Sequence, residues 1–236
     1  MQGLLPFSDA FALFFFVFCW ITYGVLVGRA ARQGRGLMAL MHANRTRWMR
    51  QMEGREVRIV DTAIMGSLQN GTAFFASTSL IAIGGAAALT RAADDVLRLF
   101  SDLPFGLEMT RGLWEIKAVG LAVIYGYAFF KFAWAYRLFN YSAILIGATP
   151  PLPSPDAEAR RRAADRAARM TIAAGGHFAR GQRAFFFSFA YLGWFLGPAA
   201  LIATSALISF VVWRRQFRSD AVFALLPEEE RASAHP

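Results

Sequence analysis

Residues 184–213 read AFFFSFAYLGWFLGPAALIATSALISFVVW, thirty positions without a charged side chain. About 20 apolar residues in helical form suffice to cross the hydrocarbon core of a bilayer, so this stretch is long enough to span a membrane with tilt or a bend. Gly193, Gly197 and Pro198 lie where a kink is expected. The stretch therefore predicts one bent membrane-spanning helix.

The composition of the whole chain agrees with a membrane as its solvent. Of the 236 residues, 56% are hydrophobic, 23 are Phe and only 17% are charged, which is richer in apolar side chains than an ordinary soluble domain. Residues 7–28 form a second long apolar stretch, with six Phe and with Asp9 as the one charge at its mouth. No positive charge precedes this stretch, so we expect a retained helix rather than a cleaved secretory signal.

Two weaker stretches complete the predicted fold. Residues 68–90 contain Gly84 and Ala88, two small residues four positions apart. This spacing favours close packing of a neighbouring helix. Residues 116–140 are interrupted by Lys131 and Arg137, so one long or bent helix is expected there instead of two short spans. The sequence predicts an all-α fold, an integral membrane bundle of four transmembrane helices with additional amphipathic or cytoplasmic helices, in a single membrane domain.

Charge differs sharply between the connecting segments. The predicted cytoplasmic segments, residues 29–60 and 150–183, contain eight and seven arginines. Residues 91–117, which include the predicted outer loop 91–115, hold four basic and five acidic groups. Because Lys and Arg are enriched in cytoplasmic loops, we expect both termini, including the polar tail 214–236, on the non-cytoplasmic side. The four basic residues of that tail fit this orientation least well.

The first cytoplasmic segment has the pattern of a basic helix at a membrane surface. Residues 37–58 place Met38, Met41, Trp48 and Met52 near one side, among arginines. Such a helix is typical of contact with anionic lipid headgroups, although a solvated loop extension would explain the same residues. This pattern also accounts for the net charge of +9, so we expect no nucleic-acid partner. The candidate headgroup-binding residues are Arg45, Arg47, Arg50, Arg180 and Arg183.

Polar residues in or beside the predicted spans are the second set of candidates, because charge inside hydrocarbon is costly and tends to be paired or functional. Arg58 and Asp61 stand three positions apart and can form a salt bridge, and a reach of Asp61 across to Arg137 or Lys131 is the alternative. Snorkelling of its long stem toward the headgroups explains Lys131 without any function. The candidate polar intramembrane cluster consists of Asp61, Asn70, Lys131, Arg137 and Asn140.

No catalytic or metal-binding pattern accompanies these residues. His42, His177 and His235 lie far apart in the sequence, and Cys19 is the only cysteine. The HExxH, CxxC and GxSxG patterns and the Gly-rich phosphate loops do not occur in the sequence. We therefore expect no enzyme activity, no cofactor and no metal site.

Blocks spread over most of the chain carry a family resemblance. They are Asn44-Arg45, Trp48-Met49, Met52, Arg58–Asp61, Phe75–Ser79, Gly84-Gly85, Lys131–Trp134, Arg137, Phe139–Tyr141, Arg180-Gly181, Arg183–Phe186, Gly193–Phe195 and Pro198. Together they resemble the bacterial membrane-protein family catalogued as domain of unknown function 599. The resemblance implies a four-helix membrane architecture and a bacterial inner membrane, and it implies no established activity.

Two functions of different classes are consistent with these features. The first is a noncatalytic multi-pass membrane protein that acts as a packing, accessory or interaction module. Its expected partners are the lipid bilayer with its anionic headgroups and either a second copy or another membrane protein. The alternative is a small oligomeric channel or transporter built around a polar intramembrane seam. Ion flux that changes when Lys131 is replaced would indicate this function.

Overall fold

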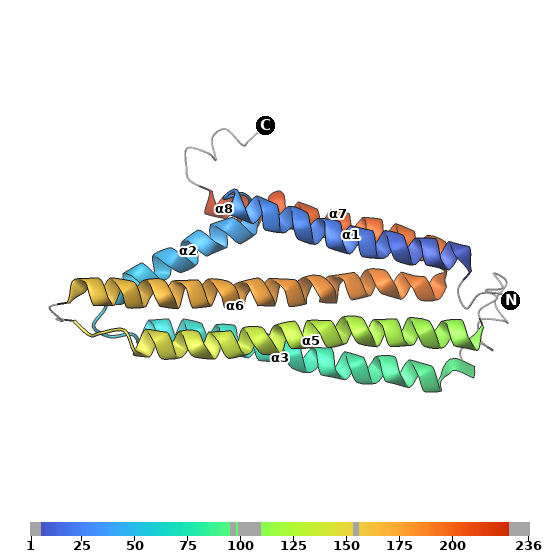
Figure 1. Ribbon diagram of the computed structural model, residues 1–236, viewed down its shortest axis with the longest axis horizontal. Coiled ribbons are helices and arrows are strands. Elements are labelled where there is room, and N and C mark those ends of the chain that lie inside the picture. Colours follow the sequence, from blue (N-terminus) through green and yellow to red (C-terminus); the bar gives the residue numbers. More distant parts are fainter. Residues whose placement is uncertain (1–5, 95–97, 99–109, 153–155, 227–236) are drawn as a thin grey trace. The chain divides into compact units, whose positions relative to one another are not determined.

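The computed structural model describes residues 6–94, 98, 110–152 and 156–226. Most of the predicted outer loop 91–115 and the end of the predicted tail lie outside these residues. In the described part of the chain the ordered elements are all helices, which confirms the all-α class (Figure 1). They are α1 (Phe7–Arg32), α2 (Gly36–Glu53), α3 (Ile59–Arg91), α5 (Arg111–Gly147), α6 (Ala157–Leu192), the short 3-10 helix η1 (Gly193–Leu196), α7 (Pro198–Phe217) and α8 (Asp220–Leu225).

Among the described residues, three helices are long and apolar enough to cross a membrane, namely α1, α3 and α5. They contain 26, 33 and 37 residues, and at 1.5 Å per residue each exceeds the roughly 30 Å of a hydrocarbon core. The predicted spans 7–28, 68–90 and 116–140 fall inside them. The helix α5 continues without a break through Lys131 and Arg137, as predicted.

The fourth predicted span, residues 184–213, is not one helix, and this part of the prediction is wrong. The helix α6 ends at Leu192, and after η1 the backbone at Gly197 has a φ of 126°, a conformation open mainly to glycine. The chain then doubles back, since Thr204 Oγ1 in α7 donates a hydrogen bond of 2.7 Å to the carbonyl of Ala190 in α6. The glycines and the proline mark a reversal rather than a kink, so α6 and α7 form a helical hairpin (Figure 1).

The chain divides into two compact units. Unit 1 comprises residues 1–26, 77–130 and 181–213, and unit 2 comprises residues 27–76, 131–180 and 214–236. Over the full sequence, unit 1 holds five Lys and Arg against six Asp and Glu, a net charge of −1. Unit 2 holds 20 against 10, a net charge of +10. All of the excess positive charge of the chain therefore belongs to unit 2.

Aromatic and small side chains fill the core of unit 1. Phe16 packs edge to face on Phe187 and Tyr191, with ring centroids 5.9 and 5.4 Å apart. Tyr191 also lies so close to Gly120 that a Cβ at that position would overlap its hydroxyl. Glycine at position 120 is therefore required for α5 to approach α6 closely.

Two contacts, one near each end of the pair, show that α1 and α7 run in the same direction in unit 1. Near the start of α1, Asp9 accepts a hydrogen bond of 2.7 Å from Trp194, which lies just before α7. Near the other end, the hydroxyl of Tyr23 donates to the carbonyl of Val212, 3.2 Å away. The two helices therefore run in the same direction, so Asp9 in α1 and Val212 in α7 lie at opposite ends of unit 1.

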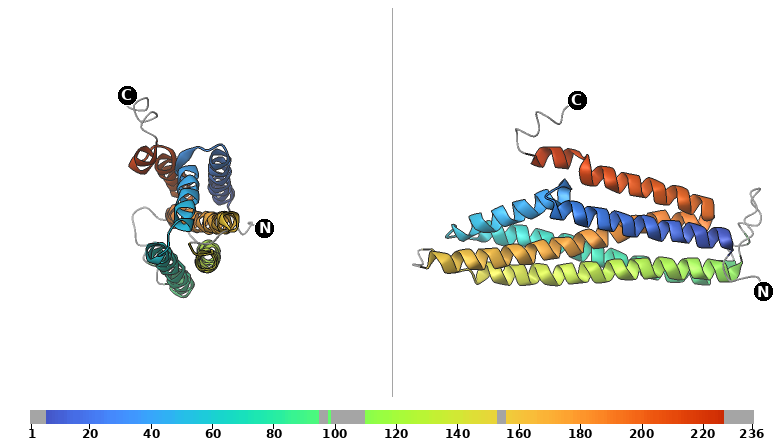
Figure 2. Two further views of the ribbon diagram at one scale, coloured as in Figure 1. Left: turned by 90° about the vertical axis from the view of Figure 1, so that its left-hand side faces the viewer. Right: turned by 45° about the horizontal axis from the view of Figure 1, so that its top comes forward.

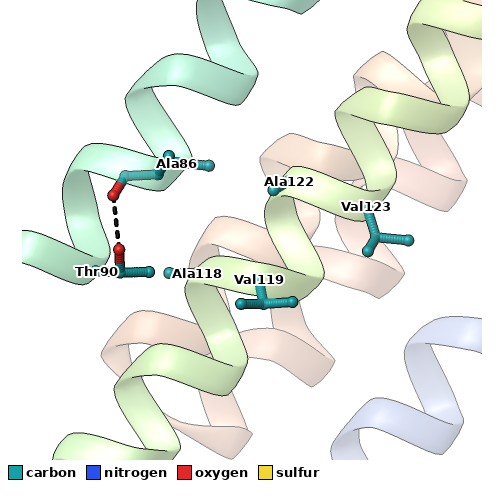
Figure 3. A pocket seen from close by; sticks show the side chains of 7 residues that line it. Ala86, Thr90, Ala118, Val119, Ala122 and Val123 are labelled. Atoms are coloured by element: carbon teal, nitrogen blue, oxygen red, sulfur yellow. Dashed lines mark hydrogen bonds between the residues drawn. The ribbon is translucent and has the colours of Figure 1, made fainter.

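The small residues of α3 make the predicted close helix contact only in part, because Ala86 is buried in the core of unit 1 with Ala82 packed against it, whereas Gly84 and Gly85 lie outside that core. Gly84 and Gly85 are exposed, and a Cβ at either would meet nothing within 4 Å among the described residues. Beside them, α3 and α5 leave a shallow apolar groove of about 420 Å³ (Figure 3). The groove is lined by Ala86, Ala87, Thr90, Ala118, Val119, Ala122 and Val123.

Unit 2 has its own core, into which α2 inserts two methionines. Met49 and Met52 are fully buried and pack with Met65, Phe139 and small residues of α6. The helix α2 is inclined to α6, as Figures 1 and 2 show, and α8 packs against α2. The helix predicted in residues 37–58 is confirmed as far as Glu53, and residues 54–58 are not helical. The methionine side of α2 is covered partly by protein.

Candidate functional site

Asp61 is the centre of a polar site in unit 2. It lies in the first turn of α3 and is fully buried. Its Oδ1 accepts hydrogen bonds from Trp48 Nε1 at 2.7 Å and from Arg55 Nη1 at 2.6 Å. The predicted salt bridge between Arg58 and Asp61 is therefore wrong in its partner, because the turn after α2 brings Arg55 to the carboxylate instead. The second oxygen, Oδ2, is buried without a hydrogen-bond partner in the described part of the chain.

Arg58 instead donates hydrogen bonds to backbone carbonyls at the end of α5, a contact that was not predicted from the sequence. Its guanidinium donates to the carbonyls of Ile146, Thr149 and Pro150, at 3.1, 2.6 and 2.8 Å. The last carbonyls of a helix have no partner inside the helix, and a nearby arginine can supply one. The signal was present in the sequence as Pro150 and Pro151, which follow α5 and cannot donate to those carbonyls.

The other members of the predicted polar cluster are also in unit 2, but their described hydrogen bonds run to different partners. Asn140 Oδ1 accepts from Gln69 Nε2 at 2.7 Å, which joins α5 to α3. Arg137 Nε donates to the hydroxyl of Tyr141 at 2.6 Å and is exposed. Asn70 is exposed and Lys131 is half-buried. Of these two hydrogen bonds, the one between Gln69 and Asn140 joins two helices and the one between Arg137 and Tyr141 lies within α5.

A buried ion pair in unit 1 was not predicted. Lys117 is 1% exposed and Asp9 is 5% exposed. Lys117 Nζ lies 3.6 Å from Asp9 Oδ1 and donates to the carbonyl of Trp194 at 2.8 Å, while the indole of Trp194 donates to the same Asp9 oxygen at 2.7 Å. The three residues therefore tie α1, α5 and the α6–α7 turn together. The available signal was that Asp9 and Lys117 each lie in the first two turns of a helix.

The predicted headgroup-binding arginines occupy different environments. Arg47 is exposed, and Arg50 is exposed with its Nε 3.9 Å from Asp165. Arg183, in unit 1, lies over the ring of Tyr23 at 5.9 Å from its centroid. Arg45 and Arg180, both in unit 2, are half-buried. The five arginines therefore differ in exposure and in the residues that they contact.

Burial and like charge lower the pKa of several basic groups in unit 2. Burial lowers the pKa of Arg45, and burial followed by the charge of Arg45 lowers that of His42. The pKa of His177 is lowered by burial, then by Arg180 and Lys131. Within the described residues, no three His, Cys, Asp or Glu side chains lie close enough together to hold a metal ion.

Acidification should destabilise the protein through His42 and His177. Because their pKa values are lowered in the folded chain, both stay neutral there while the unfolded chain takes up protons below pH about 6.5, the ordinary pKa of histidine. Stability is thus present above that pH and is lost as the pH falls below it. Thermal unfolding in detergent should show this decline, and the double variant His42→Gln with His177→Gln should flatten it. An equally steep decline in the double variant would contradict the assignment.

Comparison with known proteins supports the sequence resemblance. A family model described as "Protein of unknown function, DUF599" matches residues 11–221. No curated protein and no solved structure matches the chain.

Proposed function

Since the chain belongs to the DUF599 family, whose description assigns no activity, we propose from its charge distribution that it is a noncatalytic membrane-interaction module. Unit 1 is the part embedded in the bilayer, in a bacterial inner membrane. Unit 2 is the basic part, which contacts anionic lipid headgroups at the cytoplasmic surface. A second copy or another membrane protein would complete its set of partners.

The observation that carries this proposal is the separation of charge between the units, −1 in unit 1 against +10 in unit 2. The change is abrupt along the chain. At four of the five places where the chain passes from one unit to the other, a basic residue stands within three positions, namely Arg29, Lys131, Arg180 and Arg214. Lys and Arg anchor membrane helices at the cytoplasmic headgroups, so unit 2 belongs on the cytoplasmic side.

This orientation changes the expectation for the termini. Both termini were expected outside on the basis of four crossings, but after the reversal at Gly197 Val212 in α7 lies at the end of unit 1 opposite to Asp9 in α1. We therefore propose that the N-terminus lies outside and the C-terminus lies in the cytoplasm. Arg214, Arg215 and Arg218, which fitted the earlier expectation poorly, then lie on the cytoplasmic side.

Reporter fusions test this orientation. A fluorescent protein that matures only in the cytoplasm should be bright when fused after Pro236, and alkaline phosphatase, which is active only outside, should be inactive there. The opposite pattern is expected for fusions before Met1. An outside C-terminus would overturn the placement of unit 2. Separately, ion conduction in liposomes that is lost when Lys131 is replaced would favour the channel alternative over a noncatalytic module.

A further inference from the structure

Three exposed side chains of α5 in unit 2 form one contact group. Trp134, Arg137 and Tyr141 follow each other at intervals of three and four positions, the spacing of neighbours on one face of a helix. Cζ of Arg137 lies 5.7 Å from the ring centroid of Trp134 and 5.5 Å from that of Tyr141. Nε of Arg137 also donates a hydrogen bond of 2.6 Å to the hydroxyl of Tyr141. The guanidinium is therefore held against two aromatic side chains on the surface of the helix.

These contacts order the guanidinium of Arg137 before any ligand arrives. Trp134 is itself held by an edge-to-face contact with His177 of α6, with ring centroids 6.4 Å apart. A free arginine side chain loses rotamer entropy when it binds a ligand, and contacts that order it beforehand reduce that cost. By contrast, the exposed Arg169 of α6 makes no hydrogen bond, ion pair or ring contact with another described residue.

The contact group contains hydrogen-bond donors that have no acceptor in the described part of the chain. Arg137 uses Nε on Tyr141, and its two Nη groups donate to no other described residue. The hydroxyl of Tyr141 accepts from Arg137 and keeps its own hydrogen to donate, for which no described residue is an acceptor. A guanidinium carries donors and no acceptor, so the ligand that these groups fit is an anion rich in acceptor oxygens.

The position of the contact group along α5 indicates the source of that anion. Residues 118–130 of α5 carry no charge, and Lys131 and Arg137 are the first two basic residues after them. Trp and Tyr together with basic residues are typical of the headgroup level of a membrane. On the proposed function this part of α5 lies at the cytoplasmic headgroups, where the phosphates of phospholipids are abundant anions.

We propose that Trp134, Arg137 and Tyr141 form a binding site for the phosphate group of an anionic phospholipid. The Nη groups of Arg137 donate to two phosphate oxygens, which the planar guanidinium fork matches in geometry. The hydroxyl of Tyr141 donates to the same phosphate, and the indole of Trp134 offers an apolar surface to the lipid beside it. The site deepens the proposed function and rests on it, because contact of unit 2 with headgroups is what brings Arg137 to a lipid phosphate.

Native mass spectrometry of the purified full chain tests the site. Phosphatidylglycerol and phosphatidylcholine are offered together, and each retained lipid is counted. The unmodified chain should prefer phosphatidylglycerol, because no choline neutralises the charge of its phosphate. Arg137→Gln should lower the retention of phosphatidylglycerol about tenfold, the effect of losing one charge-assisted hydrogen bond. Arg169→Gln removes the same charge from an exposed position of α6 and should leave the retention unchanged.

Two tyrosines of α5 provide a second matched comparison. Tyr136 and Tyr141 are 39% and 36% exposed, and of these two hydroxyls it is that of Tyr141 that accepts the hydrogen bond from Arg137. Tyr141→Phe should lower the retention of phosphatidylglycerol about fivefold, because the phosphate loses a donor and Arg137 loses the acceptor that orients it. Tyr136→Phe removes the same group from the same helix and should retain the lipid as the unmodified chain does.

The outcomes separate the site from the function on which it rests. Equal retention of both lipids by the unmodified chain would overturn the headgroup function and the site with it. A preference for phosphatidylglycerol that Arg137→Gln lowers no more than Arg169→Gln does would overturn the site alone. Equal effects of Tyr141→Phe and Tyr136→Phe would also overturn the site alone, because the site requires the hydroxyl of Tyr141.

Discussion

Replacing Lys117 by Met should destabilise the protein by about 3 to 5 kcal/mol, the usual cost of removing one partner of a buried ion pair. Lys117 is 1% exposed, so its removal leaves the carboxylate of Asp9 buried without a positive neighbour. The carbonyl of Trp194 loses the ammonium as a donor and keeps the backbone N–H of Gly197. For a chain of this size the unfolding midpoint should fall by about 10 °C. Thermal unfolding of the protein in detergent, followed by loss of the monodisperse peak, measures the shift.

A second substitution distinguishes loss of charge pairing from loss of packing. In the double variant Asp9→Asn with Lys117→Met, the buried charge is gone while the amide oxygen can still accept from the indole of Trp194. Replacing a complete buried ion pair by neutral groups is often close to neutral in free energy, so the double variant should recover most of the lost midpoint. A double variant that is less stable than Lys117→Met alone would show that the ammonium acts through packing and not through Asp9.

The long apolar helices could be predicted from the sequence because length and hydropathy alone decide whether a segment can cross a bilayer. That argument located α1, α3 and α5 and kept α5 in one piece through Lys131. It could not separate a bent span from a hairpin in residues 184–213. Hydropathy does not show whether the chain continues or turns back. The reversal depends on one backbone angle at Gly197 and on the contact of Thr204 with Ala190.

The polar contacts were harder to predict because they depend on which helices meet. Asp61 was recognised as a candidate, yet its partners Arg55 and Trp48 come from the turn after α2 and from α2 itself. Asp9 and Lys117 are 108 positions apart in the sequence, and the sequence analysis placed only Asp9, at the start of the first apolar stretch. Spacing within one helix carries no information about such pairs, so only the packing of α1 on α5 could bring them together.

Replacing Arg58 by Gln should be the second most damaging single change among those considered, at about 2 to 4 kcal/mol. The shorter side chain cannot reach Ile146, Thr149 and Pro150 together, so the carbonyls of Thr149 and Pro150, just after α5, lose the donor that Arg58 provides. The carbonyl of Ile146 keeps the backbone N–H of Thr149 as a donor. Thr149 is 2% exposed, which leaves its carbonyl with little access to water. Amide hydrogen exchange should therefore accelerate over the last turn of α5 and the residues that follow it, in addition to a lower unfolding midpoint.

Two further variants determine whether stability depends on the forked guanidinium of Arg58 or only on its charge. Arg58→Lys keeps the charge but offers a single ammonium, so it should retain only part of the stability, whereas a purely electrostatic role would leave Lys equal to Arg. Arg47→Gln removes the same charge from an exposed position and should change neither the midpoint nor the exchange at the end of α5. If Arg58→Gln behaves like Arg47→Gln, the three carbonyls are satisfied in another way, and Arg58 does not fix the end of α5.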